Sequence, residues 1–232
     1  MSDVYLGRLP ILDTKQNVVA YELLFRADHH NKAIVANNSA ASANVIIETY
    51  GQLGIDNVIG KRRGFIKVDA QLLMHDSILL LPKKHVVLEI LRGVEITETI
   101  TQRCAFLKQK GYQLALSYTA QSSTHYDHIL SLVNIVKINV NELTSAHLIA
   151  VMKQLRRFPI LLLAEKVETQ ETAKHCISLN FQMLQGFFFT QPEVMSGKNI
   201  DPSKLSLLKL MLLVVRDGDI SEIENELKYQ PG

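Results

Sequence analysis

Gly64-Phe65-Ile66-Lys67-Val68, followed by Val86-Val87-Leu88-Glu89-Ile90, is the part of the sequence that decides the fold. Each run is short, β-rich and apolar except for one charged residue, which predicts a strand that is buried on both faces. Similar runs follow at Gln113–Leu116, Ile135–Ile138, Pro159–Leu163 and Phe181–Leu184. Segments with amphipathic helical spacing lie between the runs, at Thr97–Lys110, Val140–Leu155 and Glu168–Leu179. Strands that alternate with helices in this way predict a parallel α/β sheet.

The residues before these runs predict a β-hairpin. Tyr5–Leu12 and Val18–Phe25 are β-rich, and the turn-forming residues 13–17 separate them. Asn37–Gln52 then has capping residues and the spacing of a helix. The hairpin and the six later strands make eight, which favours a TIM-like (β/α)8 barrel, a fold of roughly 250 residues. A doubly wound open sheet is the alternative, but no glycine-rich phosphate turn follows the first strand.

Composition narrows the class of protein. The 232 residues carry 25 Lys and Arg against 23 Asp and Glu, and no run of basic residues is dense enough to follow a nucleic-acid backbone. The longest apolar runs are far too short to cross a bilayer, and the N-terminus lacks the features of a signal peptide. Two cysteines, Cys104 and Cys176, cannot form a disulfide framework. We therefore expect a cytoplasmic protein that binds neither membranes nor nucleic-acid polymers.

Polar residues recur where the predicted strands end, which is where barrel enzymes place their functional groups. Such residues are costly inside apolar strands unless they are paired, so their repetition predicts one shared polar cluster. Its expected members are Glu22, Lys67, Glu89, Ser117, Tyr118, Lys137, Glu165, Glu168 and Gln185.

Around these residues the sequence resembles the EAL family, barrel enzymes that hydrolyse the bacterial messenger cyclic di-GMP to a linear dinucleotide. The motifs that carry the resemblance are, in order, Pro10-Ile11-Leu12-Asp13, Glu22-Leu23-Leu24-Phe25-Arg26, Val86-Val87-Leu88-Glu89-Ile90, Val136-Lys137-Ile138, Ala164-Glu165-Lys166-Val167-Glu168-Thr169 and Gln185-Gly186-Phe187. Each motif is weak alone, but the ordered series over residues 4–192 is specific.

The resemblance implies a site that holds two divalent cations, Mg²⁺ or Mn²⁺, which active members require. The positions Glu22, Glu89, Lys137, Glu165, Glu168 and Gln185 match that site. Two metal-bridging aspartates of the family are instead Ser117 and Tyr118, and its ligand asparagine is Lys67. These replacements make the site more positive by three charges, so we expect neither metal binding nor catalysis.

Three functions are compatible with these residues. The first is a catalytically inactive signalling module that acts through a protein partner or an attached domain. The second is a metal-independent receptor for cyclic di-GMP, in which Arg26, Lys67 and Gln185 bind the ligand, since a guanidinium suits phosphate. The third and least favoured is an active phosphodiesterase.

The C-terminal residues differ in kind from the barrel. Leu205–Val215 is almost continuously apolar, and an acidic stretch follows it. The opening motif resembles the branch in which an EAL domain precedes an all-helical HDOD domain. We therefore expect an EAL-like barrel over 1–197, and over 198–232 a linker helix with the start of an otherwise absent HDOD-like domain. The resemblance also implies dimerisation through helices near the fifth and sixth strands, although Ser117–Asp127 has diverged.

Overall fold

A computed structural model describes residues 5–26, 54–118, 124–189 and 193–196. The predicted hairpin is present as β1 (Tyr5–Asp13) and β2 (Val18–Arg26), which pair antiparallel. Its turn forms because the Asp13 carboxylate accepts hydrogen bonds from the backbone N–H groups of Lys15 (2.9 Å) and Asn17 (2.8 Å). The helix expected over 37–52 and all of 198–232 lie outside the described residues.

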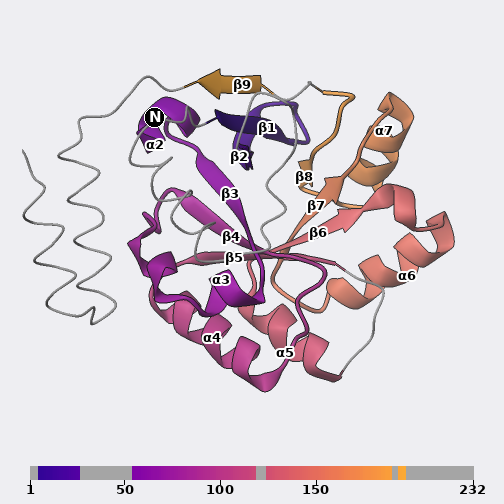
Figure 1. The fold of residues 1–232 in the computed structure, drawn as a ribbon. Helices are drawn as coiled ribbons and strands as arrows, with labels where there is room; N and C mark the ends of the chain where they lie inside the picture. The colour runs from indigo at the N-terminus through magenta and orange to yellow at the C-terminus, as the bar shows by residue number, and fades with distance from the viewer. Residues whose placement is uncertain (1–4, 27–53, 119–123, 190–192, 197–232) are drawn as a thin grey trace, which may run out of the picture.

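The strands form a closed barrel (Figure 1). The parallel strands after β2 are β3 (Arg63–Val68), β4 (Val86–Ile90), β5 (Gln113–Ser117), β6 (Ile135–Asn139), β7 (Leu161–Glu165) and β8 (Met183–Leu184). Strand β1 runs antiparallel between β2 and β8 and closes the ring. The predicted (β/α)8-type barrel is therefore confirmed, and β9 (Glu193–Ser196) extends it by pairing with the first half of β1.

Helices pack around the outside of the strands (Figure 1). They are α2 (Ile55–Ile59), α3 (Ala70–Met74), α4 (Glu98–Gln109), α5 (Thr124–Leu132), α6 (Ser145–Leu155) and α7 (Gln170–Ser178), with 3-10 turns η1 (Asp76–Leu80) and η2 (Val140–Glu142). The apolar space between them and the sheet holds both cysteines, which are buried as free thiols. No helix in the described part of the chain is long and apolar enough to cross a membrane.

Three predicted boundaries were wrong for local reasons. Strand β7 begins at Leu161 rather than Pro159, because the chain turns there and the Ile160 N–H bonds to Phe158 O. Strand β8 begins at Met183 rather than Phe181, because the Phe181 N–H bonds to Cys176 O at the end of α7. The helix expected from Val140 begins at Ser145, because the Thr144 hydroxyl caps it by accepting from the His147 N–H.

The interior of the barrel is built in layers. One apolar side chain from each of the eight barrel strands contributes to a buried cluster: Ile11, Ala20, Phe65, Val87, Ala115, Ile135, Leu163 and Met183. Side chains alternate between the two faces of a strand, so the residue two positions further along also faces the interior. For β2 to β7 that next position is Glu22, Lys67, Glu89, Ser117, Lys137 and Glu165, and for β8 it is Gln185, directly after the strand. The fold therefore places seven of the predicted site residues in one polar layer.

Candidate functional site

Lys137 is the centre of the polar layer. Its side chain is fully buried, and its Nζ lies 2.7 Å from Glu22 Oε2 and 2.9 Å from Glu89 Oε2. A third contact joins Nζ to Glu89 Oε1 at 3.0 Å. One ammonium group therefore bridges two buried carboxylates, which supplies all three of its donors with acceptors.

Lys67 is the second cation of the layer. Its Nζ lies 2.7 Å from Glu22 Oε1, while 39% of its side chain remains exposed. The expected contact between this lysine and a site carboxylate is therefore present. Because Lys67 is partly open to solvent and Lys137 is not, Lys67 forms the outer wall of the cluster.

Neutral side chains occupy the remaining hydrogen-bonding positions of the two glutamates. The Ser117 hydroxyl donates to Glu89 Oε1 at 3.0 Å, and Gln185 Nε2 donates to Glu22 Oε2 at 2.9 Å. Both residues are buried. Gln185 Oε1 is also buried and has no hydrogen-bond partner among the described residues.

The two glutamates differ in acidity. Burial alone would raise the pKa of Glu22, but the charges and hydrogen bonds of Lys137 and Lys67 outweigh it and hold that pKa well below its usual value. Burial raises the pKa of Glu89, and the negative charge of Glu22 acts in the same direction. Lys137 and Lys67 lower this pKa but do not outweigh burial. Burial alone would lower the pKa of Lys137, but the negative charges of Glu22, Glu89 and Glu165 outweigh it and raise that pKa.

The other predicted site residues lie at the edge of this cluster or away from it. Glu165 is half-buried and acts on Lys137 through its charge, and Glu168 is exposed. The Tyr118 ring packs against the apolar core outside the sheet, while its backbone N–H donates to Lys137 O at 2.7 Å. Arg26 belongs to β2, but its side chain is not among those described.

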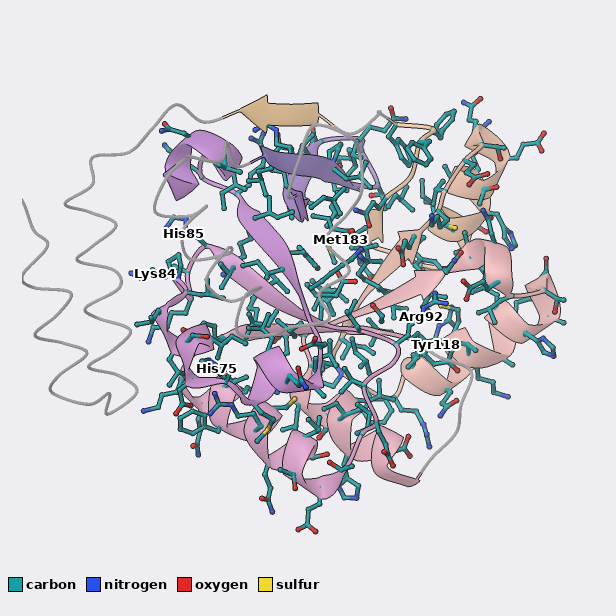
Figure 2. The ribbon with its side chains drawn as sticks, viewed as in Figure 1. His75, Lys84, His85, Arg92, Tyr118 and Met183 are labelled. Atoms are coloured by element: carbon teal, nitrogen blue, oxygen red, sulfur yellow. The ribbon has the colours of Figure 1, made fainter. Side chains whose placement is uncertain are left out.

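One ion pair near the site was not predicted. Arg92, which follows β4, pairs with Glu142 in η2, and Asn139 Nδ2 donates to Glu142 Oε1 at 2.7 Å. The pair joins the loops that flank β5, and Figure 2 shows Arg92 and Tyr118 at the same end of the barrel. Only the strand order brings these residues together, so the sequence held no local signal for the pair.

Comparison with known proteins identifies the architecture. A model of the EAL domain matches residues 9–192. The chain belongs to the EAL family. An uncharacterized protein, YuxH of Bacillus subtilis, is 29% identical over 212 residues, which cover 90% of this chain and 52% of YuxH. The cyclic di-GMP phosphodiesterase CdgJ of Vibrio cholerae is 30% identical over 217 residues, 90% of this chain and 49% of CdgJ.

This EAL chain therefore spans about half the length of the curated relatives that it matches. Among solved structures, the EAL domain of Mycobacterium smegmatis DcpA superposes with a TM-score of 0.65 at 22% identity. That match covers 94% of this chain and 99% of the DcpA domain, and it agrees with the closed barrel.

Proposed function

We propose that this chain is a catalytically inactive EAL-family module for signalling, which acts through a protein partner or by regulating an attached helical domain. The observation that carries the proposal is the ion pair of Lys67 with Glu22, in a layer where Ser117 and Tyr118 replace the two aspartates that the resemblance implies. Lys137 occupies a position that matches the active family, so the decisive differences are Lys67, Ser117 and Tyr118.

The residues present do not fit the two divalent cations that active members require. Such cations need anionic oxygen ligands. Here both Glu22 oxygens and both Glu89 oxygens already accept hydrogen bonds, chiefly from ammonium groups. A charge near Lys67 would feel repulsion of about 4 kcal/mol per unit charge at 4 Å and a surface-like dielectric. Within the described residues, no group of three His, Cys, Asp or Glu side chains is arranged to hold a metal ion.

Hydrolysis of cyclic di-GMP tests the proposal. With Mg²⁺ or Mn²⁺ present, we expect no linear dinucleotide from the purified chain, because the carboxylates that would bridge the cations are absent. Linear dinucleotide that forms at a rate proportional to the protein concentration, and does not form with Glu22→Ala, would refute the proposal. The matched gain-of-function variant is Lys67→Asn with Ser117→Asp and Tyr118→Asp, since restoring the aspartates alone would leave Lys67 opposing the metals.

A second candidate is a metal-independent receptor for cyclic di-GMP, and the partial exposure of Lys67 favours it. Lys67 holds Glu22 through one contact, which leaves donors for a phosphate. Calorimetric titration with cyclic di-GMP in EDTA tests this candidate. Heat of binding that the wild-type chain gives and Lys67→Met does not give would support a receptor. If the wild-type chain gives no heat of binding at any cyclic di-GMP concentration, the interaction module remains the favoured function.

The attached domain is the remaining part of the proposal. We assign 1–197 to the barrel and 198–232 to a linker helix and the start of an HDOD-like domain, because Leu205–Val215 is almost wholly apolar and needs cover. Limited proteolysis of the chain tests this division. Cleavage near residue 198 that leaves a barrel of unchanged thermal stability would support it, and a large loss of stability would contradict it.

A further inference from the structure

Three short basic runs meet at the end of the barrel opposite to the polar layer. They are Lys61-Arg62-Arg63, which leads into β3 and ends on its first residue, Lys83-Lys84 before β4, and Lys108 with Lys110 before β5. Arg63 Nε donates to Lys84 O at 3.3 Å, and Lys83 Nζ donates to Lys110 O at 3.0 Å. Runs that are well separated in the sequence therefore adjoin in space, and we call these seven residues the basic face.

The basic face lacks compensating charge within the described part of the chain. All seven side chains are exposed, and no described carboxylate lies within ion-pair distance of any of them. Asp13 lies in the turn at this end, but its carboxylate serves Lys15 and Asn17 of that turn. Figure 2 shows Lys84 and His85 on the opposite side of the barrel from Arg92 and Tyr118.

The sequence has no dense run of basic residues, but folding brings three short runs together into one basic cluster. Seven cations on one surface repel one another within a Debye length of about 10 Å, and an acidic partner would relieve this repulsion. The whole chain has a formal net charge of only +2, so it carries nearly enough acid to balance itself. The densest acidic run is residues 217–226, which contain Asp217, Asp219, Glu222, Glu224 and Glu226 and no Lys or Arg.

We propose that the acidic segment 217–226 of the same chain docks on the basic face. The described chain leaves the barrel at Ser196, which pairs with Tyr5 at the end that holds the polar layer. Twenty residues then precede Asp217. With Leu205–Val215 as the linker helix proposed above, these eleven residues span about 16 Å, and the other nine can span about 30 Å when extended. The total is about twice the length of a six-residue strand, so the segment can reach the opposite end.

A nucleic acid is the less favoured occupant. Single-stranded nucleic acids bind to grooves that combine cations with exposed aromatic rings. The aromatic residue that follows the third basic run, Tyr112, is buried, and its hydroxyl donates to Leu81 O at 2.9 Å. Phe106, a partly buried ring beside the third run, is covered by the Arg103 guanidinium at 5.2 Å and by Lys110 Nζ at 5.3 Å from its centroid. Both of these aromatic rings, among the residues that the structure describes, are therefore buried or already occupied by cations rather than open for stacking. This inference uses no residue of the polar layer, so it does not depend on catalytic inactivity. It shares residues 198–232 with the proposed attached domain, which limited proteolysis tests separately.

Zero-length crosslinking of the full chain tests the docking. A carbodiimide joins a carboxylate to a lysine amine as an amide and takes up the water that is lost, so it reports ion pairs. We expect the monomer band to contain crosslinks from the segment 217–226 to Lys83, Lys108 or Lys110. Their yield should not depend on protein concentration.

Charge-reversal variants make the test specific. Lys61→Glu with Lys84→Glu removes two ammonium groups that make no hydrogen bond within the described residues, and we expect the remaining crosslinks to fall about fivefold. Lys153→Glu with Lys174→Glu, an equal change at exposed positions of α6 and α7, should leave the yield unchanged. Equal yields in both variants, or crosslinks found only in a dimer band, would overturn the docking.

Binding of polyanions separates the remaining occupants. We expect the wild-type chain to bind neither polyuridine RNA nor phosphatidylserine vesicles at about 150 mM salt, because the acidic segment occupies the face. If the wild-type chain binds either polyanion and the double variant Lys61→Glu with Lys84→Glu does not, the basic face belongs to a phosphate-bearing partner. That result would overturn the proposal.

Discussion

Lys137 and Lys67 divide the neutralisation of the polar layer between them. The sequence predicted that Lys67 and the strand-end glutamates would share one polar cluster, and the contact of Lys67 with Glu22 is present. Contact with both Glu22 and Glu89 belongs to Lys137, which is buried where Lys67 is partly exposed. The sequence could not rank the two lysines, because side-chain reach and burial depend on the neighbouring strands.

Replacing Lys137 should have the largest effect on stability of any change in this layer. Lys137→Met keeps most of the side-chain volume but leaves two buried carboxylates without their shared cation. We expect a loss of about 3–5 kcal/mol in the free energy of unfolding at pH 7. Urea denaturation measures it, and Lys153→Met, at an exposed lysine of α6, is the control and should change it by less than about 0.5 kcal/mol. A loss equal to that of the control would show that the cluster contributes nothing to stability.

The two glutamates should respond to acid with opposite signs. The pKa of Glu22 is lowered in the folded state, so its contribution to stability is present above the usual value of 4.5 and is lost as the pH falls through the lowered pKa. The pKa of Glu89 is raised, so the folded state takes up that proton more readily and gains stability as the pH falls towards 4.5.

We therefore expect Glu22→Gln to flatten the loss of stability below about pH 4.5. Glu89→Gln should remove the gain above about pH 4.5 and so steepen the fall of stability as the pH drops towards that value. Each change should alter the slope by at most about 1.4 kcal/mol per pH unit, the value for one proton. Urea midpoints from pH 3 to pH 7 measure the slopes. Changes of the same sign in both variants would contradict the assignment.

At the scale of elements, the turn after β8 holds Gln185 in the polar layer. The Val167 N–H donates to Gln185 O at 2.9 Å, and the Phe188 N–H returns to Val167 O at 3.3 Å. Gly186 lies between these contacts, where a Cβ atom would stand 2.0 Å from Val167 O. The sequence indicated a strand end at Gln185-Gly186-Phe187, but only the structure shows that the glycine is required by backbone contact.

Gly186→Ala should consequently displace this turn. Because a methyl group would overlap the Val167 backbone, we expect a loss of about 2–3 kcal/mol in stability. Gly93→Ala is the matched control, since nothing lies within 4 Å of a Cβ at that position. Thermal unfolding of both variants decides the matter, and equal melting temperatures would mean that the chain relaxes around the methyl group.

At the scale of the whole molecule, the alternation of strands with helices predicted the barrel, and the polar residues at the strand ends predicted seven members of its polar layer. The structure adds that each of these residues lies two positions after an inward-facing apolar one. Pairs between loops, such as Arg92 with Glu142, and the gathering of the basic face depend on which strands are neighbours. Neither could be predicted from runs or spacing along the chain.

The central claim is that the Lys67 ammonium group pairs with Glu22 in this barrel and takes the place of the divalent cations that active family members require. Manganese binding, followed by electron paramagnetic resonance of free Mn²⁺, tests it most directly without reference to activity. We predict that the wild-type chain leaves Mn²⁺ free and that Lys67→Asn with Ser117→Asp and Tyr118→Asp binds it. Mn²⁺ bound by the wild-type chain and released in Glu22→Gln would contradict the claim.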